Sequence, residues 1–153
     1  MNSKKYNSKN ELVSVIIVNW NGKKWLKKCL ESFNSQTYKN IEILIVDNDS
    51  TDESVAYLKQ YFPGIKIIIN KNNLGYPRAV NIGIKKSKGE YILLINNDTW
   101  VKKDFVDKLY KFYKNNNYSV ISPIVREYDD GNASVNIPTI DPTGSPAYFF
   151  PIT

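Results

Sequence analysis

Four clusters of asparagine and aspartate, each directly after a short apolar run, are the side chains of this sequence that could do chemistry. The clusters begin at Asn19, Asp47, Asn70 and Asn96. Their carboxylates and amides can hold a hard divalent cation or read the hydrogen-bonding edge of a heterocycle. The runs before them are rich in Val and Ile and apolar on both faces, which is typical of buried parallel strands. We therefore expect the four clusters at one edge of a parallel sheet, where such sheets bind ligands.

Asp98 has the sharpest candidate role. It follows an apolar strand, and Asn96 and Asn97 precede it as neutral oxygen donors. A Mg²⁺ or Mn²⁺ ion needs only one or two carboxylates when water and substrate phosphates complete its shell. Alternatively, Asp98 and Thr99 cap the turn before the next helix. From the spacing alone, both interpretations stay open.

The Asp47-Asn48-Asp49 run and Trp20 are candidates for binding a heterocycle. Asp and Asn also favour the turn before a helix, but one such residue is enough for that purpose. Three adjacent polar groups at a strand end fit the recognition of a base edge. Trp20 is either a core or rim aromatic residue or a surface on which a base stacks.

The composition narrows the class of protein. The chain has 153 residues, no His and a single cysteine, Cys29, which shares helical spacing with Leu26, Leu30 and Phe33 and is expected in the core. The formal net charge is +6, but the lysines are spread over the polar faces of three predicted helices. We therefore expect no nucleic-acid partner. Without an apolar signal or membrane segment, the expected location is cytoplasmic, with peripheral attachment at the inner membrane face as an alternative.

Strand and helix patterns alternate along the chain, which predicts a three-layer α/β domain with an open, mostly parallel sheet. Residues 1–11 are expected to be flexible, 12–126 to form the core and 127–153 to be irregular. Ser50 to Glu53 has the pattern of a capping box. The expected strands lie near 13–18, 41–46, 65–69, 90–95 and 118–125, and the expected helices near 23–34, 51–62, 77–87 and 102–114.

Several ligand classes lack their motifs. No G-x-G-x-x-G follows the first strand, and Asn21 to Lys24 is not a phosphate-cradling loop. A phosphoacceptor domain would need paired acids after the first strand, where the chain has Asn19-Trp20-Asn21. A sugar-1-phosphate nucleotidyltransferase would open with a Gly-rich basic loop there.

Four motifs, taken together, resemble those of the family 2 glycosyltransferases and, within them, the rhamnosyltransferase-like branch. They run from Ser14 to Gly22, Val46 to Asp52, Asn73 to Gly83 and Gly89 to Thr99. The resemblance implies a GT-A fold, a nucleotide-sugar donor and inverting transfer of the sugar to a hydroxyl of a glycan or lipid-linked glycan acceptor. It also places Asp98 at the metal-binding end of the family's D-x-D element.

The resemblance further implies a UDP- or dTDP-sugar site. Val18 and Trp20 would line the nucleoside pocket with Asp47, and Asn48 stands where many members have an Asp that faces the base. The Asn48 amide could accept a hydrogen bond from N3–H and donate one to a ring carbonyl of uracil or thymine.

On the diphosphate side, Asn96 and Asn97 replace carboxylates of other branches, which leaves Asp98 alone to anchor Mg²⁺ or Mn²⁺. Asn73 and Gly75 fit the turn beside the sugar diphosphate. Arg78 lies two residues before the position of a phosphate-facing arginine in some members.

The catalytic base stays unassigned. In the family it is an Asp or Glu well downstream of the D-x-D element, and here only Glu127, Asp129, Asp130 and Asp141 follow in an irregular stretch. We therefore expect the donor-binding half of a longer enzyme, with negligible transfer on its own. An apolar stretch at 148–150 would favour self-association. The alternative is a non-catalytic nucleotide-sugar-binding module that needs a partner chain.

Overall fold

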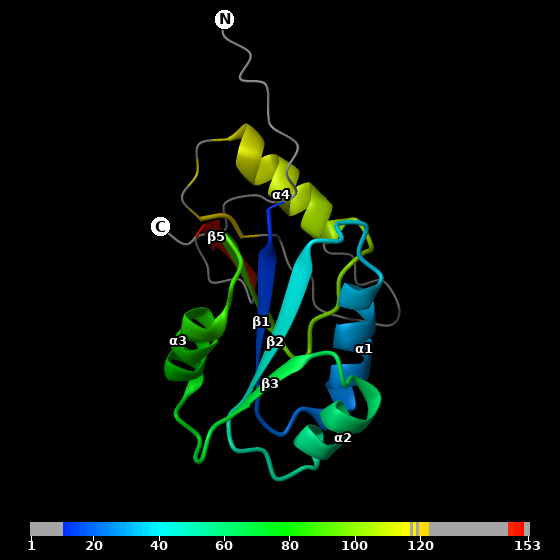
Figure 1. Ribbon diagram of the computed structural model, residues 1–153, viewed down its shortest axis with the longest axis vertical. Helices are drawn as coiled ribbons and strands as arrows, with labels where there is room; N and C mark the ends of the chain where they lie inside the picture. Colours follow the sequence, from blue (N-terminus) through cyan, green and yellow to red (C-terminus); the bar gives the residue numbers. More distant parts are fainter. Residues whose placement is uncertain (1–10, 117, 119, 123–146, 152–153) are drawn as a thin grey trace, which may run out of the picture.

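The computed structural model describes residues 11–116, 118, 120–122 and the strand at 147–151. Figure 1 shows a twisted sheet with helices on both faces. The strands lie in the order β3-β2-β1-β4-β5. The elements in chain order are β1 Val13–Asn19, α1 Lys23–Asn34, β2 Ile41–Asp47, α2 Ser54–Tyr61, β3 Lys66–Ile69, α3 Tyr76–Lys86, β4 Tyr91–Asn96, α4 Phe105–Asn115 and β5 Ala147–Pro151.

The parallel strands confirm the expectation from the apolar runs. All seven residues of β1 are buried, because β1 has a neighbour on each side and helices over both faces. β1 pairs in parallel with β2 and β4, and β2 pairs in parallel with β3. The register sets Asn19 beside Asp47 and Val18 beside Asn96. The polar clusters therefore do meet at one edge of the sheet.

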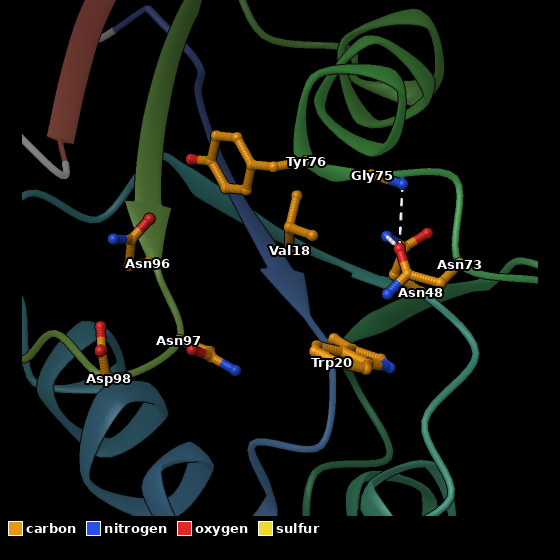
Figure 2. Close-up of a pocket in the computed structure, with 9 residues that line it drawn as sticks. All are labelled: Val18, Trp20, Asn48, Asn73, Gly75, Tyr76, Asn96, Asn97 and Asp98. Atoms are coloured by element: carbon orange, nitrogen blue, oxygen red, sulfur yellow. Dashed lines mark hydrogen bonds between the residues drawn. The ribbon is translucent and has the colours of Figure 1, made fainter.

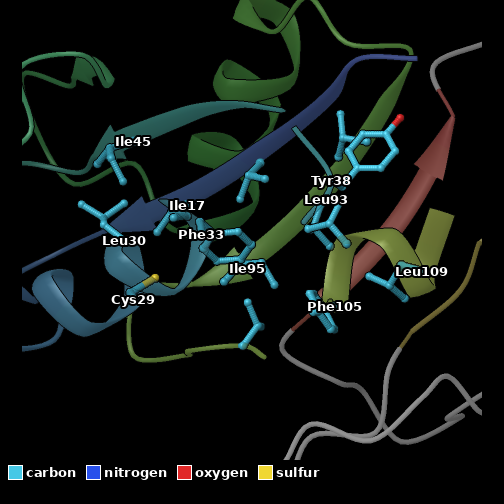
Figure 3. Close-up of a cluster of buried hydrophobic side chains, with 14 of the residues drawn as sticks. Ile17, Cys29, Leu30, Phe33, Tyr38, Ile45, Leu93, Ile95, Phe105 and Leu109 are labelled. Carbon is cyan, nitrogen blue, oxygen red and sulfur yellow. The ribbon is translucent and has the colours of Figure 1, made fainter. Parts of the chain in front are cut away.

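Alternate residues of the strands point to two separate cores, as a pleated strand requires. Ile17, Ile45 and Leu93 face one side of the sheet, where they pack against α1, α2 and α4. Figure 3 shows this cluster, including Cys29 and Leu30 of α1. Residues of the opposite strand faces, Ile16 among them, pack with α3 on the other side. These two cores make the predicted three layers.

Cys29 is a core residue, as its helical spacing predicted. Its side chain is fully buried in the hydrophobic cluster between α1 and the sheet. Burial raises the pKa of the Cys29 thiol to about 12, and the Asp98 charge acts in the same direction. The thiol is therefore protonated at neutral pH and unsuited to act as a nucleophile.

The expected capping box at 50–53 is wrong. Helix α2 begins at Ser54, because the capping side chains have other partners. The Ser50 hydroxyl accepts a hydrogen bond from the backbone N–H of Asn21 at 2.9 Å, and Glu53 forms an ion pair with Lys23 at 2.7 Å. The backbone N–H of Ser54 instead donates to a carboxylate oxygen of Asp52. The side chains after β2 thus tie two loops together rather than starting a helix.

The fifth strand differs from the expectation at 118–125. Residues 118, 120 and 122 belong to no strand and Ile121 makes only an isolated bridge, while 123–125 lie outside the described residues. The sheet is completed by β5, which pairs antiparallel with β4 from Ile95 opposite Ala147 to Tyr91 opposite Pro151. Residues 1–10 and 123–146 lie outside the described part, as does the side-chain exposure of 148–150. Within the described residues, no helix has the length and apolar character needed to span a membrane.

Close packing of α3 on β1 generates a testable prediction. A Cβ atom at Gly83 would lie 2.5 Å from Ile16 Cγ2 and 3.2 Å from Val46 Cγ2. We expect Gly83→Ala to lower the melting temperature by about 2–6 °C, because a contact this close should cost roughly 2–3 kcal/mol in overpacking, which exceeds the helix-propensity gain of about 1 kcal/mol. Thermal denaturation followed by circular dichroism measures this change. Lys85→Ala, at an exposed position of the same helix, is the control and should be nearly neutral. A Gly83→Ala variant as stable as the wild type would contradict the packing argument.

Candidate functional site

A cavity of about 370 Å³ opens at the carboxyl edge of the sheet, between the ends of β1, β2 and β4 and the start of α3. All of the sequence-predicted site residues line it except Asp47 and Arg78. Figure 2 shows Asn96 and Asp98 on one side of this cavity and Asn48 and Asn73 on the other. The lining residues are Val18, Trp20, Asn48, Asn73, Gly75, Tyr76, Asn96, Asn97 and Asp98.

Asp98 is exposed in the turn that follows β4. The alternative interpretation of Asp98 as a helix cap is wrong, because α4 begins only at Phe105 and its N-cap position is Asp104. The carboxylate instead lines the cavity. A rim carboxylate that makes no hydrogen bond or ion pair within the described part of the chain is available to a ligand.

The amide of Asn48 is largely used within the protein. Asn48 is 2% exposed, and its Oδ1 accepts hydrogen bonds from Asn70 Nδ2 and from the backbone N–H of Leu74, both at 3.0 Å. Its Nδ2 donates to Asn73 Oδ1 at 2.6 Å. Because both lone pairs of Oδ1 are engaged, the expectation that this oxygen accepts from the N3–H of a base needs correction. Only one N–H of Asn48 is left for a ligand.

Asp47 and Arg78 do not line the cavity, and their expected role in nucleotide-sugar binding stays a prediction. Asp47 is 1% exposed, and its two carboxylate oxygens accept from Asn19 Nδ2 at 2.9 Å and from the backbone N–H of Ser50 at 3.0 Å. Asp47 is therefore held below the rim. Arg78 is exposed, because the helical turn directs the next residue, Ala79, toward the sheet.

Asn97 lines the cavity, and its amide nitrogen is engaged by a residue at the end of another strand. Asn97 Nδ2 donates to Asn19 Oδ1 at 2.8 Å. Asn19 is fully buried at the end of β1. The sequence places Asn19 at the start of a polar cluster but assigns it no role of its own, since nothing in the local sequence shows which residue of another strand end it contacts. The position directly after a buried strand was the only available signal.

Two aromatic rings flank the cavity. Trp20 is 57% exposed, so it lies at the rim and not in the core. Tyr76 is 43% exposed and directly follows Gly75, whose φ of 79° disfavours any residue with a side chain. Tyr76 was not predicted, although an aromatic residue next to such a glycine turn is a usable signal. In Figure 2 the Tyr76 ring lies on the side of Val18 opposite Trp20.

The donor groups around the cavity fit a divalent cation that is shared with a ligand. The described residues contain no group of three or more His, Cys, Asp or Glu side chains that could hold a metal by themselves. Among the residues that line the cavity, Asp98 is the one with a carboxylate. A Mg²⁺ or Mn²⁺ ion held by one carboxylate needs phosphate oxygens and water to complete its shell.

Comparison with known proteins gives a consistent picture of the family. The model described as "Glycosyl transferase family 2" matches residues 14–150. The chain is 35% identical over 127 residues to the glycosyltransferase GlyG of Streptococcus pneumoniae, covering 80% of this chain and 42% of that protein. The chain spans less than half the length of this relative, and 14% and 34% of the length of two other curated relatives.

Two solved structures share the fold. The 1-349 fragment of Staphylococcus aureus TarS in complex with UDP has a TM-score of 0.65 at 24% identity, over 71% of this chain and 34% of that one. A mannosyltransferase from Pyrobaculum calidifontis in complex with GDP-Man and Mn²⁺ has a TM-score of 0.70 at 19% identity, over 78% of this chain and 37% of that one. Both likenesses concern the fold alone.

The Asn48 network generates a prediction for stability. Asn48→Ala removes the partner of Asn70 Nδ2, Leu74 N–H and Asn73 Oδ1 at a buried position. We expect the free energy of unfolding to fall by roughly 1–3 kcal/mol, because buried polar groups are left unpaired. Differential scanning calorimetry should show a melting temperature lower by about 3–10 °C. The control is Asn72→Ala, an exposed position in the same loop. Equal stability of the two variants would show that the network contributes little.

Proposed function

The chain belongs to glycosyl transferase family 2, and from this premise we propose that its cavity binds the nucleotide end of a UDP- or dTDP-sugar with a Mg²⁺ or Mn²⁺ ion on the diphosphate. One observation carries the proposal: Asp98 is an exposed carboxylate that lines a cavity whose opposite wall is made of neutral amides. This arrangement separates a side suited to a cation from a side suited to a base. A diphosphate would extend from one to the other.

The base side of the cavity supports a pyrimidine. The remaining N–H of Asn48 and the amide nitrogen of Asn73 can donate to ring carbonyl oxygens, which uracil and thymine have and adenine lacks. Trp20 offers an exposed ring on which a base can stack, and Val18 supplies an apolar floor. A volume of about 370 Å³ is near the small end of ligand pockets, which also favours a pyrimidine over guanine.

In the reaction, the sugar would be transferred with inversion to a hydroxyl of a glycan or lipid-linked glycan acceptor. A divalent cation, when bound, would stabilise the charge of the departing nucleoside diphosphate. Asp98 would hold that cation, and the Asn48 and Trp20 side would hold the base, so that the anomeric carbon is kept in a fixed place. The finer assignments are proposals on the same footing: a rhamnosyltransferase-like branch, a role in polysaccharide biosynthesis, and a cytoplasmic location with peripheral attachment at the inner membrane face.

A second candidate function is a nucleotide-sugar-binding module without transfer activity of its own. It is favoured by the chemistry of the described cavity, where the carboxylate of Asp98 has no second carboxylate beside it to accept the proton of an acceptor hydroxyl. The candidates Glu127, Asp129, Asp130 and Asp141 lie outside the described residues. Incubation of this chain with a radiolabelled donor and a panel of glycan acceptors tests this candidate together with the expectation that a donor-binding half transfers negligibly on its own, because robust labelled product from residues 1–153 would contradict both.

The role of Asp98 is testable by binding. Isothermal titration calorimetry should show that Mn²⁺ raises the affinity of the wild-type chain for UDP at least tenfold, and that Asp98→Asn loses this gain while keeping the Mn²⁺-free affinity. The fold should be unaffected, because the carboxylate is exposed. Glu31→Gln, on the exposed face of α1, is the control and should behave like the wild type. If Asp98→Asn keeps the full effect of Mn²⁺, Asp98 is not the cation ligand.

The choice of base is testable by thermal shift in the presence of Mn²⁺. A ligand at ten times its dissociation constant stabilises the native state by about 1.4 kcal/mol, which raises the melting temperature of a domain of this size by about 3–6 °C. We expect UDP and dTDP to give the largest shifts, GDP a smaller one and ADP the smallest. A GDP shift equal to or above that of UDP would contradict the pyrimidine assignment.

A further inference from the structure

We propose that Asn19 is a positioning residue that fixes the turn carrying Asp98 and so sets the affinity for the cation. The inference rests on the proposed function of Asp98 but concerns a side chain that does not line the cavity. Asn19 is fully buried at the end of β1, the central strand between β2 and β4. It acts through Asn97, the residue directly before Asp98.

Every hydrogen-bonding group of the Asn19 amide has a fixed partner. Its Nδ2 donates to Asp47 Oδ1 at 2.9 Å and to Ser50 Oγ at 3.1 Å, and its Oδ1 accepts from Asn97 Nδ2 at 2.8 Å. The backbone carbonyl of Asn19 also accepts from the N–H of Asn48 at 2.7 Å. One residue thus joins the ends of three strands.

This pattern allows only one orientation of the Asn19 amide. If the amide were flipped, its nitrogen would face Asn97 Nδ2 and its oxygen would face the carboxylate of Asp47. Two donors and two acceptors would then be opposed in a buried place, which is costly. Asp47 is itself held by the backbone N–H of Ser50 at 3.0 Å. The loop after β2 therefore fixes the Asp47 carboxylate, Asp47 fixes the amide of Asn19, and Asn19 fixes the amide of Asn97.

Gly22, directly before α1, packs against the hydrogen bond between Asn19 and Asn97. A Cβ atom at Gly22 would lie 2.0 Å from Asn97 Nδ2 and 2.6 Å from Asn19 Oδ1. The backbone of Gly22 is therefore packed directly against this hydrogen bond, with no room for a side chain. Asn97 cannot turn toward Gly22, and its position in the turn after β4 is restricted.

Restriction of Asn97 matters because Asp98 is its neighbour in a two-residue turn. If Asp98 is the one protein carboxylate that holds the cation, the protein preorganises the site mainly by fixing the direction of that carboxylate. Residues that orient a metal ligand typically change metal affinity by 10–100-fold when they are mutated. We therefore expect Asn19 to act on the cation-dependent part of binding and not on the base.

The first test measures UDP affinity by calorimetry with and without Mn²⁺. Asn19→Ala and Asn97→Ala should each weaken Mn²⁺ binding in the presence of UDP by about 10–100-fold. Because Asn19 does not line the cavity, Asn19→Ala should change the Mn²⁺-free affinity for UDP less than about threefold. The double variant should bind Mn²⁺ about as tightly as whichever single variant binds it less tightly, because both substitutions remove the same hydrogen bond. A residue that only supports the fold would lower both affinities together.

The second test exchanges the amide and the carboxylate. Asn19→Asp alone sets two carboxylates against each other and should weaken Mn²⁺ binding like Asn19→Ala. Adding Asp47→Asn restores a donor facing an acceptor, and the new carboxylate at position 19 still accepts from Asn97. We expect this exchange to recover Mn²⁺ affinity to within about fivefold of the wild type. The exchange variant also tests the positioning role if Asn19→Ala does not fold.

The outcomes separate the inference from the function on which it rests. If the wild type shows Mn²⁺-dependent UDP binding and the Asn19 and Asn97 variants show it equally, the positioning role is overturned and the proposed function stands. Parallel loss of Mn²⁺-dependent and Mn²⁺-free binding in Asn19→Ala, or an exchange variant no better than Asn19→Asp, also overturns the positioning role. If the wild type itself has no Mn²⁺-dependent binding, the proposed function fails and the inference with it.

Discussion

The cavity depends on one constraint, which is that polar side chains at the ends of buried strands must hydrogen-bond to one another. β1 and β2 end in Asn19 and Asp47, both almost fully removed from water. An unpaired polar group in such a place costs free energy comparable to a lost hydrogen bond or more. Among the described residues, no buried side-chain nitrogen or oxygen lacks a partner. The shape of the rim follows from the way in which this requirement is met.

Asparagine meets the requirement better than an acid would. An amide both donates and accepts, so several can be linked without accumulating charge. The structure has two such networks, one around Asn19 below the cation side and one around Asn48 below the base side. Aspartates in the same places would repel one another at this burial. Because the lining residues that belong to these networks are amides, Asp98 is the carboxylate among the residues that line the cavity, which makes its direction important.

The strands and the position of the rim could be predicted from the sequence because both depend on short-range patterns. The run from Tyr91 to Ile95 is apolar throughout, so the residues after it had to emerge at the edge of the sheet. The capping box failed because Ser50 and Glu53 bond to residues about 30 positions earlier in the chain. Whether an asparagine faces the cavity or another asparagine is likewise decided by partners distant in sequence, as with Asn19 and Asn97. Local spacing carries no information about such pairs.

The position of β4 in the sheet has a consequence for folding kinetics. β4 pairs with β1, which is separated from it in the chain by two other strands and three helices. Such non-local parallel pairing is slow, because the entropy of closing a long loop is lost before any contact forms. The hydrogen bond between Asn19 and Asn97 spans 78 positions of the chain and can form only after this pairing. The cation side of the cavity should therefore be among the last parts of the chain to become ordered, so that a refolding protein would acquire its helices well before it could bind a metal-nucleotide complex.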